Sequence, residues 1–171
     1  MIVGIAIAVS IIILDQVTKY FLYGITAPLI SDFLWLEEAF NTGASFGMFK
    51  NGTLFFIIIS TPLIALMIWL LVSKNKNITN YLKACIGVLL GGTLGNYFDR
   101  IFLGGVRDFI YFKSIDFAIF NMADVAITVG TIMIAVYLVI DIIKDIKNNK
   151  KAKQIKTEEK KEEDESNINS K

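Results

Sequence analysis

The sequence predicts an all-α integral membrane protein with four transmembrane helices and a small extracytoplasmic β-rich element between helices 1 and 2. Apolar residues make up 54% of the 171 residues, more than a soluble domain with a polar surface carries. Four apolar runs each have about the twenty residues that an α-helix needs to cross a bilayer. Most charged residues lie near the ends of these runs or after the last one.

The four predicted spans are separated by polar or glycine-containing links. They cover residues 2–23, 53–72, 81–103 and 121–143. The first link, residues 24–52, contains Pro28, several glycines and scattered aromatic residues, and it is too poor in apolar residues to cross a membrane. We therefore expect this link to form a few short strands outside the membrane or at its surface.

The chain length allows one membrane domain, which we assign to residues 1–147. Residues 148–171 are rich in Lys and Glu and low in hydrophobic residues, which predicts a disordered charged tail. Lysines flank the second link, and five more lie between residues 144 and 153. Because positive charges favour the cytoplasmic side, both termini are expected in the cytoplasm and residues 24–52 and 104–120 outside.

Three aspartates are predicted to lie at one depth in the membrane. At about 1.5 Å of rise per residue, Asp15 lies roughly 20 Å along the first span from its cytoplasmic start. Asp99 lies about 24 Å beyond Lys83, and Asp124 about 30 Å from Lys144. A hydrocarbon core of roughly 30 Å then puts all three carboxylates near the outer face. Since intramembrane charges are costly, this shared level indicates a functional site.

The composition narrows the chemistry of such a site. The chain has no histidine, which excludes Ser-His and Cys-His mechanisms, and its one cysteine, Cys85, cannot form an intramolecular disulfide. A zinc site is improbable with this ligand set, and we expect neither a metal nor a cofactor. Acid-base chemistry must use carboxylates, lysine, tyrosine or a terminal amine. Two carboxylates that share a water can hydrolyse a peptide bond, one as base and the other as acid.

Asp124 is the first candidate for such a pair, because it shares one helical stripe with Asn121 and Thr128. The residues alone leave the second member open among Asp15, Asp99 and Asp108. Simpler structural roles are also available to the neighbouring residues. Asp15 and Lys19, four residues apart, can form an ion pair, and Asn121 can cap the last helix.

Five short segments together resemble the bacterial lipoprotein signal peptidases, or signal peptidase II. These segments are residues 15–19 (DQVTK), 41–47 (NTGASFG), 91–100 (GGTLGNYFDR), 106–109 (VRDF) and 120–124 (FNMAD). Each segment alone is weak evidence, but five in order along four spans make a specific signature. Arg107 departs from the family pattern, in which an apolar residue is usual between Val106 and Asp108. The stretch from Asp108 to Asp124 is also slightly short for the family.

The resemblance implies a membrane-embedded aspartyl endopeptidase in the bacterial cytoplasmic (inner) membrane, with its active site near the outer face. Its partners would be membrane lipid and prolipoproteins carrying diacylglyceryl-cysteine, cut just before that cysteine, and no nucleic acid. By residue match, the catalytic pair is Asp108 and Asp124. The residues implied to support this pair or bind substrate are Asp15, Lys19, Asn41, Gly43, Asn96, Arg100 and Asn121. Asp99 is expected to be structural, in an ion pair.

Two other classes of protein can also carry polar residues inside helices. An ion-coupled transporter would do so, but its charges usually lie at the midplane and its fold is usually built from repeats, which this sequence lacks. A structural membrane protein would use the same residues to hold helices together. The structural reading predicts that Asn at positions 108 and 124 would spare function.

Overall fold

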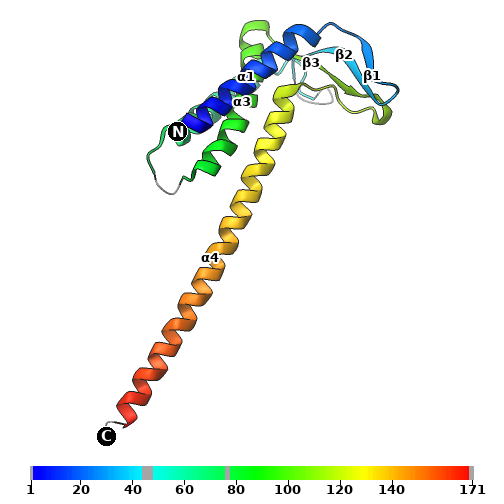
Figure 1. Cartoon of the computed structure of the whole chain (residues 1–171). Helices are drawn as coiled ribbons and strands as arrows, with labels where there is room; N and C mark the ends of the chain where they lie inside the picture. Colours follow the sequence, from blue (N-terminus) through cyan, green and yellow to red (C-terminus); the bar gives the residue numbers. More distant parts are fainter. Residues whose placement is uncertain (1, 44–47, 76–77, 170–171) are drawn as a thin grey trace. The chain divides into compact units, whose positions relative to one another are not determined.

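A computed structural model of the chain describes residues 2–43, 48–75 and 78–169, with side chains as far as residue 150 (Figure 1). Its elements in order are α1 (Ile2–Leu22), β1 (Ala27–Ile30), β2 (Leu34–Asn41), α2 (Thr53–Val72), α3 (Asn80–Leu103), β3 (Val106–Phe112), the short 3₁₀ helix η2 (Lys113–Ile115) and α4 (Met122–Asn169). The expected mostly helical architecture with a small sheet is therefore confirmed.

Three of the described helices are long and apolar enough to cross a membrane. They are Ile2–Leu22, Thr53–Val72 and Met122–Lys150. The remaining long helix, α3, forms at the position of the fourth expected span, but it contains four glycines and three charged residues, which lower its hydropathy. Its buried positions extend along most of its length, from Lys83 to Asp99.

Glycines on α3 allow α1 to pack closely against it, and the two helices lie side by side (Figure 1). Gly87, Gly91 and Gly95 follow each other at four-residue spacing and so share one helix face. A Cβ atom at Gly91 would lie 2.8 Å from the carbonyl oxygen of Ala8, and one at Gly95 would lie 2.5 Å from Oδ2 of Asp15. Glycine is therefore needed at position 91 for close backbone contact between the helices, and at position 95 to leave room for the Asp15 carboxylate.

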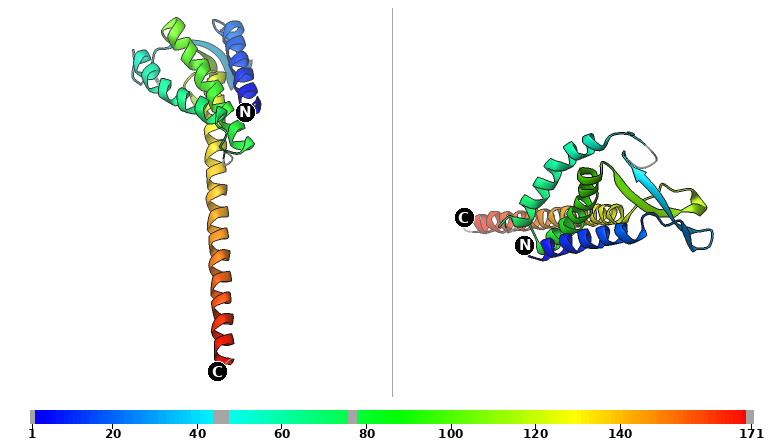
Figure 2. Two further views of the ribbon diagram at one scale, coloured as in Figure 1. Left: turned by 90° about the vertical axis from the view of Figure 1, so that its left-hand side faces the viewer. Right: turned by 90° about the horizontal axis from the view of Figure 1, so that it is seen from above.

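The sheet is antiparallel in the order β1-β2-β3 and lies beyond the C-terminal end of α1 (Figure 2). β2 pairs with β3 from Leu34 opposite Phe112 to Asn41 opposite Val106, with a bulge between Leu36 and Ala39. The predicted strands between the first two helices are β1 and β2. The third strand, β3, contains Asp108 and was not predicted.

The position of β3 follows from the end of α3. Gly104 adopts a left-handed conformation (φ 81°), and its backbone N–H donates to the carbonyl of Arg100, which ends the helix. The chain then turns back directly into Val106, and Phe120 pairs with Ile110 across the returning segment. The pairing of β3 with β2, in contrast, joins residues far apart in the sequence, and no local pattern indicates it.

The chain divides into two units, Met1–Ile134 and Ala135–Lys171. The first contains α1 to α3, the sheet and the beginning of α4, and it contains every site residue discussed below. The second continues α4, which is helical as far as Asn169 and so includes most of residues 148–171, where composition predicts disorder. That prediction and the predicted boundary at residue 147 stay predictions.

Candidate active site

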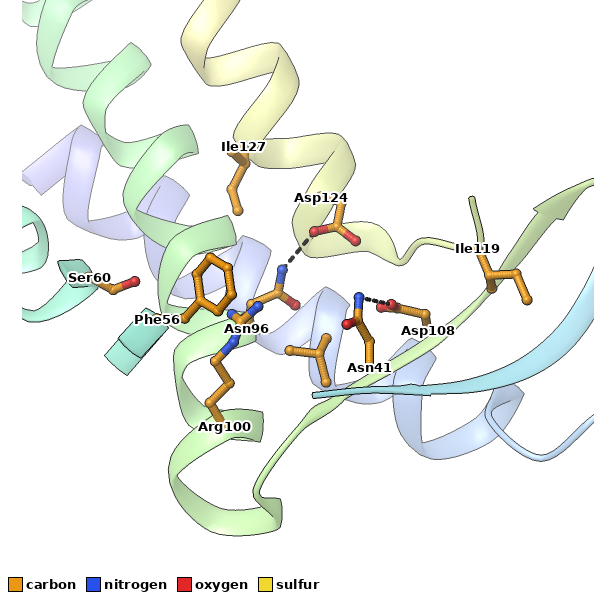
Figure 3. A pocket seen from close by; sticks show the side chains of 10 residues that line it. Asn41, Phe56, Ser60, Asn96, Arg100, Asp108, Ile119, Asp124 and Ile127 are labelled. Carbon is orange, nitrogen blue, oxygen red and sulfur yellow. Dashed lines mark hydrogen bonds between the residues drawn. The ribbon is translucent and has the colours of Figure 1, made fainter. Parts of the chain in front are cut away.

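A polar cavity of about 250 Å³ lies in the first unit, where β2, α2, α3, β3 and α4 contribute its walls (Figure 3). It is lined by Asn41, Phe56, Ser60, Asn96, Arg100, Val106, Asp108, Ile119, Asp124 and Ile127. Asp108 reaches it from β3 and Asp124 from the first turn of α4. Two carboxylates, two amides and one guanidinium thus face a common space.

Asp108 is almost fully buried, with 2% of its surface exposed. One carboxylate oxygen accepts a hydrogen bond from Nδ2 of Asn121 at 2.6 Å, and the other accepts from Nδ2 of Asn41 at 3.1 Å. Burial and, to a lesser extent, the charge of Asp124 raise the pKa of Asp108 to about 7. Asp108 therefore retains its proton at pH values where an ordinary aspartate is ionised.

Asp124 is held by a capping box at the start of α4. Its backbone N–H donates to Oδ1 of Asn121, and the N–H of Asn121 donates back to Oδ2 of Asp124, both at 3.1 Å. Nδ2 of Asn96 donates to the other oxygen of Asp124 at 2.7 Å. The predicted capping role of Asn121 is therefore confirmed, and its side-chain amide also donates to Asp108. Asn121 links the two carboxylates.

A buried lysine lies behind this pair. Lys19 is fully buried, and its Nζ lies 2.9 Å from Asp15 and 3.4 Å from Asp99. It also donates to Oδ1 of Asn96 at 2.9 Å. The predicted ion pair of Asp15 and Lys19 is thus confirmed. Asp15 in turn accepts from the backbone N–H of Ala123 at 2.9 Å, which ties α1 to the start of α4.

Arg107 completes this group of charges. Its guanidinium donates to both oxygens of Asp99, at 2.8 and 3.2 Å, and its backbone N–H donates to the same carboxylate at 3.0 Å. Nη2 also donates to Gln16 at 2.9 Å. Asp99 is therefore in ion pairs, as expected. The hydrogen bonds to Asp99 raise the pKa of Arg107.

Arg100 provides the positive charge inside the cavity. Its guanidinium lies over the ring of Phe56, 4.9 Å from the centroid, and Nη2 donates to the carbonyl of Gly43 at 3.3 Å. Its Nε is buried and has no hydrogen-bond partner among the residues that the structure describes. Gly43 N–H donates to Oδ1 of Asn41 at 2.9 Å, so this loop fixes Asn41 as well.

The predicted site residues therefore come together. Five of them line the cavity: Asn41, Asn96, Arg100, Asp108 and Asp124. Asp15, Lys19, Gly43 and Asn121 contact these five or one another, as described above. Of the three candidates for the second carboxylate, only Asp108 lines the cavity with Asp124, because Asp15 and Asp99 are held by Lys19. Residues 44–47 of the second motif lie outside the described residues.

Some residues of the site were missed from the sequence. Phe56 and Ser60 lie in an apolar run without any distinguishing pattern, and no sequence signal pointed to them. Arg107 did carry a signal, because it is a positive charge on the expected outer side and departs from the family pattern. Within the described residues, no group of three or more His, Cys, Asp or Glu is arranged to hold a metal ion.

The model of the signal peptidase (SPase) II family matches residues 7–140. The chain belongs to this family. A lipoprotein signal peptidase of Staphylococcus aureus (strain JH9) is 36% identical over 160 residues, which cover 90% of this chain and 94% of that protein. Family membership favours the peptidase interpretation over the transporter and the structural protein.

Two solved structures share the fold. Both are described as a bacterial membrane enzyme studied by the in meso method, one at 2.3 Å and one at 1.9 Å resolution. Each is 34% identical to this chain, with TM-scores of 0.72 and 0.68. They cover 81% and 79% of this chain and 88% and 91% of their own lengths. This member of the signal peptidase II family is a multi-pass membrane protein.

Proposed function

We propose that the chain is an aspartyl endopeptidase that removes the signal peptide from diacylglyceryl-modified prolipoproteins, cutting just before the lipidated cysteine. Asp108 and Asp124 are the proposed catalytic pair. One observation carries the proposal: in a chain of the signal peptidase II family, these two carboxylates face one cavity and are linked through Asn121.

The mechanism needs one ionised and one protonated carboxylate. Asp108, whose pKa is raised to about 7, is the first acid, and Asp124 is the base. Asp124 takes a proton from water as the hydroxide attacks the scissile carbonyl, and Asp108 donates its proton to the carbonyl oxygen. In the second half, Asp124 returns a proton to the leaving nitrogen, Asp108 takes one from a hydroxyl of the tetrahedral carbon, and the C–N bond breaks.

The remaining polar groups hold the substrate backbone and the carboxylates. Arg100 offers guanidinium N–H groups within the cavity, which suit a peptide carbonyl oxygen. Asn41 and Asn96 each donate to one member of the pair and so hold the two carboxylates in position. Asn121 holds the Asp108 and Asp124 carboxylates in fixed positions relative to each other through its hydrogen bonds to both residues.

An apolar cavity next to the polar one supports a lipid-modified substrate. It has a volume of about 600 Å³ and shares Asp124 and Ile127 with the polar cavity. Its walls include Phe112, Phe117 and Phe120. An acyl chain attached near the scissile bond can occupy such a space while the peptide bond lies between the two carboxylates.

The proposed setting is the bacterial cytoplasmic membrane, with four spans, both termini in the cytoplasm and the active site near the outer face. The lysines around the second link and after the last span support this orientation. α3 serves as the fourth span because its charged groups find partners in the protein: Lys83 donates to the carbonyl of Ser73 at 2.8 Å, and Asp99 pairs with Lys19 and Arg107.

The test is a cleavage assay in detergent with a diacylglyceryl-modified prolipoprotein and its unmodified counterpart. We expect cleavage of only the lipidated form, also in the presence of excess chelator. Asp108→Asn and Asp124→Asn should abolish cleavage while both variants still insert into membranes. Asp32→Asn, which changes an exposed carboxylate, is the matched control and should cleave normally. Turnover by either site variant would contradict the assignment of the pair.

A further inference from the structure

Lys19 is a buried cation that is hydrogen-bonded to an amide of the site, the side chain of Asn96. Its Nζ donates to Oδ1 of Asn96 at 2.9 Å, and Nδ2 of Asn96 donates to Asp124 at 2.7 Å. Lysine can only donate hydrogen bonds, so it can accept no N–H from the amide and must face its oxygen. Nδ2 of Asn121 donates to the same oxygen at 3.0 Å. The Asn96 amide is therefore fixed with its N–H groups toward Asp124.

The contacts of Lys19 show which of its neighbours it binds most closely. Asp99 is occupied by Arg107, which contacts it at 2.8 Å, whereas Lys19 lies 3.4 Å from it. The shorter contacts of Lys19 are to Asp15 and Asn96, both at 2.9 Å. The two carboxylates, Asp15 and Asp99, and the two cations, Lys19 and Arg107, together carry no net charge. Of its two positive members, Lys19 is the one hydrogen-bonded to the amide that contacts Asp124.

We propose that Lys19 is a positioning residue that acts on Asp124 through Asn96: it fixes the amide so that Nδ2 of Asn96 donates to the Asp124 carboxylate. It thereby holds Asp124 in position to act as the first base. This inference rests on the proposed aspartyl peptidase function and adds the contact that orients one of its two carboxylates.

Several other charged groups also act on Asp124, and a test must separate their effects from that of Lys19. Arg100 faces it from α3, and Asp108 faces it from β3 across the cavity. Asp15, Asp99 and Arg107 lie behind Asn96 with Lys19. None of these groups is itself substituted in a variant at position 19 or 96, and the double variant separates the connection through Asn96 from a direct effect of the Lys19 charge.

The experiment measures kcat/KM against pH for Lys19→Gln, together with the melting temperature. Without the lysine that fixes the Asn96 amide, the acidic limb of the profile should move to higher pH by about one unit. Lys19→Arg retains a positive charge at this position, and the acidic limb of its profile should stay at the wild-type pH. Lys83→Gln is the matched control, since Lys83 is also buried (8% exposed) but contacts Ser73 away from the site.

Lys83→Gln should lower the melting temperature without moving the limb. An unmoved limb in Lys19→Gln, or an equal shift in Lys83→Gln, would overturn the proposal in favour of a purely structural role. If Lys19→Gln does not fold, Asn96→Leu interrupts the connection while leaving Lys19 with Asp15, and the same shift is expected. Where Lys19→Gln does fold, adding it to Asn96→Leu should shift the acidic limb no further than Asn96→Leu alone.

The wild-type protein separates this inference from the proposed function. If the wild type does not cleave the lipidated substrate, the peptidase function itself is wrong. If it cleaves and neither Lys19→Gln nor Asn96→Leu moves the acidic limb, the function stands and the role of Lys19 is refuted.

Discussion

Replacing Asp108 by Asn should abolish cleavage and at the same time make the protein more stable at alkaline pH. The carboxyl group is 2% exposed, and burial together with the nearby Asp124 raises its pKa from 3.8 to about 7. The folded protein therefore binds this proton more tightly than the unfolded chain does. As pH rises from about 4 to about 7, Asp108 ionises in the unfolded chain but keeps its proton in the folded protein. Ionisation stabilises the unfolded state, so the free energy of unfolding falls.

The size of this effect follows from the shift of about three pKa units, each worth about 1.4 kcal/mol. The wild type should lose on the order of 4 kcal/mol of unfolding free energy between acidic pH and pH 8 through this group. Asn has the same shape and no proton to lose, so Asp108→Asn avoids the loss. For a chain of this length, about 4 kcal/mol corresponds to roughly 10 °C in melting temperature.

The assay is thermal unfolding in detergent, followed by the fluorescence of the two tryptophans, Trp35 and Trp69, at several pH values from 4.5 to 8. The melting temperature of Asp108→Asn should rise above that of the wild type progressively with pH. Asp32→Asn, at an exposed position, should follow the wild type throughout. A difference between Asp108→Asn and wild type that does not change with pH would refute the reasoning about burial.

Three further predictions concern the scaffold. Arg107→Leu removes one of the two cations that pair with the buried Asp99 and should lower the unfolding free energy by about 3 kcal/mol, measured by denaturation, with Arg107→Lys in between. Gly95→Ala places a Cβ 2.5 Å from the Asp15 carboxylate and should cost about 1–3 kcal/mol in the same assay. Removing residues 148–171 should leave cleavage and melting temperature unchanged, and lost activity would give the tail a function.

Much of the fold could be predicted because membrane insertion imposes long apolar runs. The spans at residues 2–23 and 53–72 were found to within one residue, and the last helix begins at Met122 with Asn121 as its cap. The third strand was missed, because its pairing with β2 joins residues some seventy positions apart, such as Ala39 and Asp108. Local patterns do not report such pairing.

The sequence by itself determined that the chain is a membrane protein, that its acid-base chemistry depends on carboxylates, and that its motifs match one family. Each of these follows from composition or from residues close together in the chain. Only the tertiary structure decided which aspartate faces Asp124, since the residues alone left Asp15, Asp99 and Asp108 as alternatives. Lys19 and Arg107 neutralise two of them, while Asn41 and Asn121 hold the third in the cavity. That selection depends on contacts between separate elements, which exist only in the folded chain.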